Sequence, residues 1–114
     1  MHEAMVAQSL LAAISSEAKK YNASPIAATV SCGTLYAIND EVLCFAFEAL
    51  AKGTPCAQVK LEIEHKPLQG RCRKCGRTFE VDITAPICPQ CESEDFELLP
   101  DAPLMLEEIE FETE

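Results

Sequence analysis

The apolar residues of this chain change their spacing several times, from helical to strand periodicity and back. Between residues 3 and 22 they recur every three or four positions, which predicts an amphipathic helix with one buried face. That face consists of Val6, Leu10, Ile14, Ala18 and Tyr21. Pro25 ends the pattern, because a proline disfavours helical geometry in the residue before it. Residues 26–35 then alternate with a period of two and predict a strand.

A second helix is predicted to begin at Asn39 or Asp40, either of which is a good N-cap, and to end at Gly53. Its buried stripe is expected to consist of Leu43, Phe47 and Leu50. Residues 57–65 alternate again between apolar and polar side chains. They predict a strand with one buried and one solvated face.

The last apolar segment, residues 104–112, also has strand character, but its apolar parity shifts at Glu107 and Glu108. Such a shift indicates a β-bulge or a change of packing partner. Residues 67–103 contain one short strand candidate, 77–83, and few apolar side chains. The sequence therefore predicts an α+β fold. Residues 1–66 and 104–114 supply two helices with a three-stranded sheet, and residues 67–103 are an insertion before the last strand.

The insertion contains two Cys-x-x-Cys motifs, separated by residues 76–87. Each motif folds back so that its two sulfurs lie close together, and two such turns facing each other supply the four thiolates of a tetrahedral Zn²⁺ site. The expected zinc ligands are Cys72, Cys75, Cys88 and Cys91. Residues 67–103 are too few to fold around an apolar core, so their folding is expected to depend on the metal. We therefore predict a four-cysteine, zinc-ribbon-like lobe as the zinc-binding domain.

Disulfides, a redox pair and an iron site use similar cysteine spacings. The N-terminal residues lack the features of a secretory signal, and no apolar run approaches the roughly 18 residues of a membrane span. We therefore expect a cytoplasmic protein with reduced thiols. A redox Cys-x-x-Cys opens a helix after a strand, and neither pair has this context. Rubredoxin-type iron stays open as the second choice, although its aromatic core is poorly matched by Phe79 and Phe96.

The chain has 19 acidic and 9 basic residues and a formal net charge of −10. This charge argues against broad binding to nucleic acid or to anionic membranes. Four of the basic residues nevertheless surround the first cysteine pair: Arg71, Arg73, Lys74 and Arg77. They either compensate the negative charge of a four-thiolate zinc centre or form a docking patch for an acidic partner.

The N-terminal sequence Met1-His2-Glu3 can chelate a metal ion. The initiator methionine is generally kept before a residue as large as histidine, so we expect a free amine one residue before an imidazole. The Met1 amine, the His2 amide nitrogen and the His2 Nδ1 close adjacent chelate rings, and Glu3 can add its backbone nitrogen and orient the site through its carboxylate. Ni²⁺ and Cu²⁺ favour such tetragonal nitrogen sites. Taken alone, the motif is weak evidence for a metal site, because a histidine at position 2 is more often part of a frayed terminus than a ligand.

The other histidine and three further cysteines are interpreted as structural. His65 continues the apolar face of its strand and is expected to be partly buried and hydrogen-bonded. Cys32 and Cys44 lie on predicted inward faces and are expected to be small core residues. Cys56 precedes a strand in a predicted loop, where its side chain could be exposed, and no base or acid in the sequence marks it as a nucleophile.

Together these features resemble the HypA-type nickel metallochaperones of [NiFe]-hydrogenase maturation. The resemblance spans essentially the whole chain and rests on the N-terminal sequence, the two cysteine pairs and several short motifs. These motifs are Val30-x-x-Gly33-x-Leu35, Phe45-Ala46-Phe47-Glu48 followed by Gly53-Thr54, Leu61-x-Ile63 and Ile109-Glu110.

The resemblance implies a protein without catalytic activity, which binds Ni(II) at Met1, His2 and Glu3 and keeps Zn(II) in the four-cysteine lobe. Residues 1–66 and 104–114 would then be the nickel-binding domain. The implied partners are the nickel-insertion GTPase HypB and the [NiFe]-hydrogenase large subunit, and in some relatives nickel also serves urease. Residues 66–103 lack the histidine that some members place near the zinc, and Cys32 stands where an aliphatic residue is common.

Two other classes compete with this interpretation. A zinc-ribbon interaction module would bind nucleic acid or a protein through the basic residues near the first cysteine pair, but the rest of the chain is acidic and offers no aromatic stacking platform. A zinc enzyme is less favoured. The Pro86-x-Cys88-x-x-Cys91 segment resembles the deaminases, but their His-x-Glu motif is absent and four thiolates would close the site.

Overall fold

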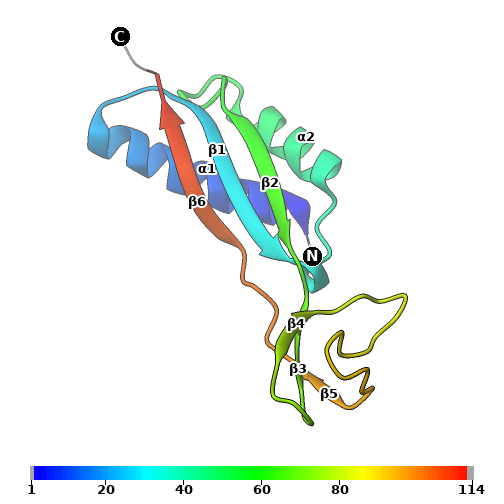
Figure 1. Cartoon of the computed structure of the whole chain (residues 1–114). Coiled ribbons are helices and arrows are strands. Elements are labelled where there is room, and N and C mark those ends of the chain that lie inside the picture. The colour runs from blue at the N-terminus through cyan, green and yellow to red at the C-terminus, as the bar shows by residue number, and fades with distance from the viewer. Residues whose placement is uncertain (1, 113–114) are drawn as a thin grey trace.

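A computed structural model describes residues 2–112, which form two α-helices and two three-stranded sheets (Figure 1). In chain order the elements are α1 (Glu3–Tyr21), β1 (Pro25–Gly33), the 3₁₀ turn η1 (Thr34–Tyr36), α2 (Asp40–Ala51), β2 (Lys60–Lys66), β3 (Gln69–Cys72), β4 (Thr78–Glu80), β5 (Phe96–Leu98) and β6 (Met105–Phe111). The α+β prediction is confirmed: two helices accompany a three-stranded sheet, and a lobe with four clustered cysteines is inserted before the last strand.

Strand β1 is the centre of the larger sheet, whose order is β2-β1-β6. It pairs in parallel with β2 and antiparallel with β6. Thr29 is opposite Glu108 and Val30 is opposite Leu106, so Glu107 is the extra residue of a β-bulge. The bulge explains the parity shift in the sequence. It also lets the Glu107 carboxylate accept a hydrogen bond from the Ser31 hydroxyl at 2.6 Å.

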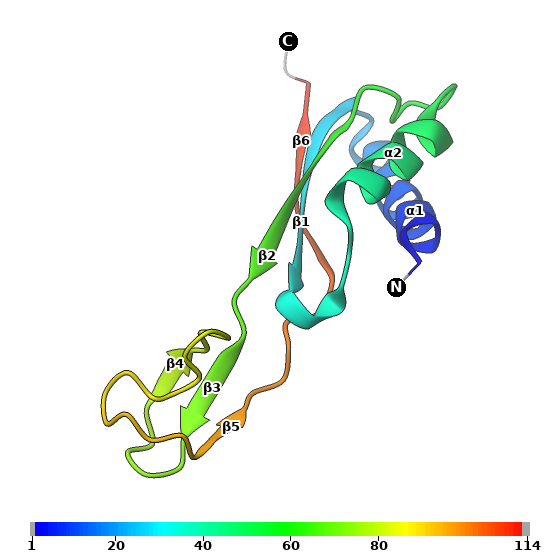
Figure 2. The ribbon, with the colours of Figure 1, turned by 90° about the vertical axis from the view of Figure 1, so that its right-hand side faces the viewer.

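Both helices cover the same face of this sheet and enclose the main core (Figure 2). Its fully buried side chains include Ile14 of α1, Val30 of β1, and Leu43 and Phe47 of α2. Two expected core positions are wrong. Leu50 is 38% exposed because Ala51 takes its place on the buried face, and Tyr21 is 60% exposed, with its ring edge-on to Phe111.

The helix ends follow the local sequence. Asn39 is the N-cap of α2, and its side-chain oxygen accepts a hydrogen bond from the Val42 amide at 3.1 Å. Helix α1 ends at Asn22, which adopts the left-handed conformation with φ 49° and donates its amide to the carbonyls of Ala18 and Lys19. Within residues 2–112, neither helix is long and apolar enough to cross a membrane.

Strand β2 begins at Lys60, later than predicted, because residues 52–59 form consecutive turns. The Ala57 amide donates to the Thr54 carbonyl at 3.1 Å, and the Val59 amide donates to the Cys56 carbonyl at 3.0 Å. These turns fold Cys56 inward. Cys56 is therefore not exposed: its side chain is buried, with its sulfur 3.4 Å from the Ser15 hydroxyl.

The inserted lobe has a sheet of its own, in the order β4-β3-β5. Strand β4 lies within the predicted segment 77–83, whereas β3 and β5 were not predicted, because each is too short to show a period. Phe79 of β4 packs edge-on against Phe96 of β5 with ring centroids 5.3 Å apart, beside the buried Cys72 and Cys88. This second core is small.

The turn at the end of β1 contacts both connections to the inserted lobe (Figure 2). The Gly33 amide donates to the Ala102 carbonyl at 2.9 Å, and the Thr34 hydroxyl donates to the Lys66 carbonyl at 2.8 Å. A Cβ on Gly33 would lie 2.0 Å from the Asp101 carboxylate, so only glycine fits without displacing this side chain. The molecule is elongated, with extents of 54 × 27 × 17 Å.

Two phenylalanines of α2 provide a matched test of this packing. Phe47 is 2% exposed and Phe45 is 74% exposed, although both belong to the same helix. We predict that Phe47→Ala lowers the free energy of unfolding by about 3–5 kcal/mol, since it leaves a cavity in the main core. Phe45→Ala should change it by no more than about 0.5 kcal/mol. Urea denaturation of both variants measures the difference, and equal losses would contradict the described burial.

Candidate metal sites

Four cysteine sulfurs of the inserted lobe converge, as their spacing predicts. Their Sγ atoms all lie within 4.8 Å of one another. Cys72 and Cys91 are 3.5 Å apart, and Cys75 and Cys88 are 3.7 Å apart. Zn–S bonds near 2.3 Å place tetrahedral sulfurs about 3.8 Å apart, so the donor set fits a tetrahedral thiophilic ion. These separations are far longer than a disulfide bond, and the cysteines are free.

The two Cys-x-x-Cys turns have the same backbone form. In the first, Gly76 has φ +76° and donates its amide to the Cys72 carbonyl at 2.9 Å. In the second, Glu92 has φ 60° and donates to the Cys88 carbonyl at 2.8 Å. Glu92 thus adopts the left-handed conformation that favours glycine, at a cost in backbone strain. The second turn therefore forms although Glu92 stands where a glycine is usual.

Backbone amides lower the pKa of two of the thiols, Cys72 and Cys88, whereas hydrogen bonds with these two neighbours help to raise the pKa of Cys75 and Cys91. The Cys75 amide, 3.5 Å from the Cys72 sulfur, lowers the pKa of that thiol to about 6. The Cys91 amide likewise lowers the pKa of Cys88. A hydrogen bond to the charged form favours the thiolate, which is the form that binds metal.

Three of the four basic residues around the first cysteine pair contact polar groups of their own lobe. Arg73 donates to the Asp95 carboxylate at 2.9 Å and to the Phe96 carbonyl at 3.1 Å. Arg71 lies 3.9 Å from the Glu97 carboxylate, and Arg77 donates to the Gln90 side chain at 2.8 Å. The positive charge of this patch is therefore partly neutralised within the lobe.

His2 immediately precedes helix α1 and occupies its N-cap position without a capping hydrogen bond from its side chain. Its backbone is extended, with φ −86° and ψ 104°, and its carbonyl accepts the amides of Met5 and Val6. Its side chain does not cap the helix, and the residue is exposed. The imidazole is thus accessible to a ligand. Met1, the other predicted member of this site, lies outside the described residues.

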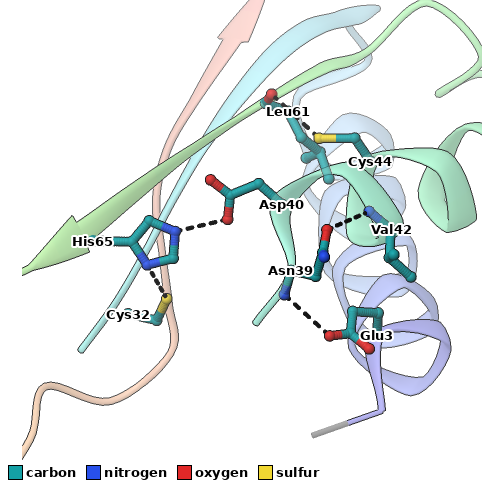
Figure 3. A network of polar contacts seen from close by, with 8 residues as sticks. All are labelled: Glu3, Cys32, Asn39, Asp40, Val42, Cys44, Leu61 and His65. Carbon is teal, nitrogen blue, oxygen red and sulfur yellow. Dashed lines mark hydrogen bonds and ion pairs between the residues drawn. The ribbon is translucent and has the colours of Figure 1, made fainter. Parts of the chain in front are cut away.

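Glu3 connects the starts of the two helices (Figure 3). Its carboxylate accepts a hydrogen bond from the Asn39 amide at 3.1 Å, and this bond is the main cause that lowers the pKa of Glu3. The carboxylate is therefore already engaged by α2. This contact has no sequence signal, because it joins residues far apart in the chain.

His65 is hydrogen-bonded, as expected, but its side chain is 42% exposed. Its Nε2 lies 2.7 Å from the Asp40 carboxylate and its Nδ1 lies 3.7 Å from the Cys32 sulfur (Figure 3). Cys32 is fully buried, as predicted for a core residue, and burial raises the pKa of its thiol. Cys44 is only partly buried, and its sulfur lies 3.9 Å from the Leu61 carbonyl. The sequence did not indicate the Cys32-His65-Asp40 chain, since its members come from three separate elements.

Comparison with known proteins agrees with this geometry. Residues 1–111 match the family model described as "Hydrogenase/urease nickel incorporation, metallochaperone, hypA". The hydrogenase maturation factor HypA of Chlorobium luteolum is 36% identical over 94 residues, which cover 82% of this chain and 80% of the relative. That of Aquifex aeolicus is 30% identical over the full length of both chains. The solution structure of the Ni metallochaperone HypA from Helicobacter pylori matches with a TM-score of 0.63 and 25% identity, covering 100% of both chains. A chain with this fold, this cysteine cluster and a match over residues 1–111 belongs to the HypA family of nickel-incorporation metallochaperones in hydrogenase maturation.

Proposed function

We propose that this protein binds Ni²⁺ at its N-terminus and delivers it to the large subunit of a [NiFe]-hydrogenase. It would act in the cytoplasm together with the nickel-insertion GTPase HypB and without catalytic activity of its own. The observation that carries the proposal is the exposed His2 at the start of α1, whose side chain takes no part in capping the helix. In a chain of the HypA family, this leaves the imidazole free for nickel.

The proposed nickel ligands are the Met1 amine, the His2 amide nitrogen and Nδ1, and the backbone nitrogen of Glu3. Amides in the first turn of a helix have no helical acceptor, so Ni²⁺ could displace the Glu3 amide proton to solvent without breaking a helical hydrogen bond. The Glu3 carboxylate is engaged by the Asn39 amide. We therefore assign the carboxylate a positioning role, in which it holds the start of α1 against the start of α2.

A site of this kind is suited to releasing its cargo. It uses one side chain and the first backbone nitrogens of the chain, so a competing set of ligands can replace them one by one. Its affinity for nickel should also fall as the pH is lowered, since protons then compete for the nitrogen donors. These properties favour transfer of nickel over storage.

We further propose that the four clustered cysteines hold one structural Zn²⁺. Four thiolates complete a tetrahedral coordination sphere and leave no position for a substrate. In this proposal residues 67–103 are the zinc-binding domain, and residues 1–66 with 104–114 are the nickel-binding domain. The small core around Phe79 and Phe96 supports the idea that the metal contributes most of the lobe's stability.

An interaction module that binds nucleic acid is less well supported. The Arg71 and Arg73 side chains face the carboxylates of Glu97 and Asp95 within their own lobe. An acidic phosphate backbone would have to displace these partners. The basic patch therefore fits compensation of the zinc-thiolate charge better than a phosphate contact.

The zinc proposal predicts a lobe-specific effect of losing one thiolate. Cys72→Ser should remove the zinc and unfold residues 67–103, because metal binding contributes about 10–16 kcal/mol in small zinc domains. The helical lobe should remain folded on its own core. Metal analysis and amide NMR spectra would measure both effects, with Cys44→Ser as the control that keeps its zinc. A lobe that stays folded after chelation would contradict the proposal.

The nickel proposal predicts that His2→Ala abolishes nickel binding in untagged protein. Zinc content and thermal stability should not change, because His2 is exposed and its side chain does not cap α1. Equilibrium dialysis and the absorption spectrum of a tetragonal Ni²⁺ centre measure the effect. His65→Ala, which removes the other histidine, should keep this centre. Full nickel affinity in His2→Ala would show that the ligands lie elsewhere.

The positioning role of Glu3 gives a separate prediction. In Glu3→Gln the side-chain carbonyl can still accept the Asn39 amide, but the negative charge is lost. Nickel transfer to an acceptor should then slow more than binding to the GTPase weakens. Transfer rate and complex affinity measured on the same samples decide this, and equal losses of both would make Glu3 an ordinary interface residue.

A further inference from the structure

Cys32 and His65 are direct neighbours on two parallel strands of the larger sheet. Cys32 of β1 is in register with His65 of β2, and their side chains meet (Figure 3). Side chains held on adjacent strands keep their separation better than side chains on loops. The pair lies outside both sites described above.

The separation of this pair suits a metal ion. Their Sγ–Nδ1 distance is 3.7 Å. With Zn–S near 2.3 Å and Zn–N near 2.0–2.1 Å, tetrahedral ligands place a sulfur and an imidazole nitrogen about 3.6 Å apart. The two atoms are therefore already spaced as ligands of one ion.

The third residue, Asp40, sets the tautomer of the histidine. Its carboxylate lies 2.7 Å from Nε2 and accepts a hydrogen bond there, so Nε2 carries the proton and Nδ1 of the neutral ring keeps a lone pair on the side of the sulfur. A carboxylate behind a histidine is the usual support for a metal-bound imidazole, because it fixes the ring and raises its basicity.

Only the histidine of the pair reaches the surface. Cys32 is fully buried, but 42% of the His65 side chain is exposed. A surface hollow beside the ring is lined by Ile38, Asn39, Asp40, Glu41 and His65. Cys32 does not line this hollow, so an ion bound by the pair would enter past the His65 ring, and water from the hollow would complete its coordination.

We propose that Cys32 and His65 form a second metal site, which takes a thiophilic tetrahedral divalent ion of the zinc class, with Asp40 as the positioning carboxylate. Binding replaces the Cys32 S–H bond with a sulfur–metal bond, and the proton leaves to solvent. Two protein ligands give a weaker site than four thiolates. The site is independent of the proposed nickel site, because it uses none of its atoms.

Titration with Co²⁺, a spectroscopic substitute for Zn²⁺, tests this proposal. The full chain is first loaded with zinc and measured at one ion per chain, and Co²⁺ is then added. We expect a near-ultraviolet thiolate-to-cobalt absorption band without release of zinc. Cys44→Ala and Cys56→Ala should keep the band, whereas Cys32→Ala and His65→Phe should lose it. Asp40→Asn should weaken the apparent affinity about 10–100-fold.

His65→Phe decides the question if Cys32→Ala does not fold, since His65 is half exposed. A band that survives His65→Phe, or that appears only as zinc is released, would overturn the proposal. The absence of any band in the unchanged chain would do so as well. In that case the three residues would form only a hydrogen-bonded chain between β1, β2 and α2.

Discussion

Pairing of β1 with strands on both of its edges is the interaction on which the rest of the structure depends. Strand β2 leads into the inserted lobe and β6 returns from it, and both pair with β1. Lys66 lies opposite Gly33 and Met105 lies opposite Ser31, so both connections meet at the same end of the sheet. This pairing therefore fixes where the lobe is attached. It also provides the apolar face on which the two helices pack.

The inserted lobe cannot be stabilised by an apolar core in the same way. Its strands are short and its core contains two phenylalanines beside two cysteines. So little apolar surface cannot offset the entropy of ordering residues 67–103, and the proposed zinc ion would supply the missing stabilisation by cross-linking the two cysteine turns. The strained φ of Glu92 fits this account, because a strong cross-link tolerates a local cost in the backbone.

The proposed nickel and structural zinc ions differ in how firmly the fold holds their ligands. The cysteine sulfurs sit in hydrogen-bonded turns, which suits an ion that stays. The nickel ligands lie at the first residues of the chain, which suits an ion that leaves. Glu3 connects this terminus to the folded lobe through the Asn39 amide, and Asp40, the next residue, contacts His65. The start of α2 thus contacts both the proposed nickel terminus and the Cys32-His65 pair.

Much of this protein is determined by local sequence. The apolar periods predicted both helices and the strands of the larger sheet, and the cysteine spacing predicted the four-sulfur cluster, because each depends on nearby residues. The parity shift at Glu107 and Glu108 indicated a bulge or a change of packing partner, and the strand register shows the bulge. The sequence did not predict β3 and β5, which are too short to show a period, or the burial of Cys56, which depends on turns that fold back against Ser15. The contacts of Glu3 with Asn39, and of His65 with Cys32 and Asp40, were decided only by the tertiary structure. Their partners are distant in sequence, and only the packing of α2 on the sheet and on α1 brings them together.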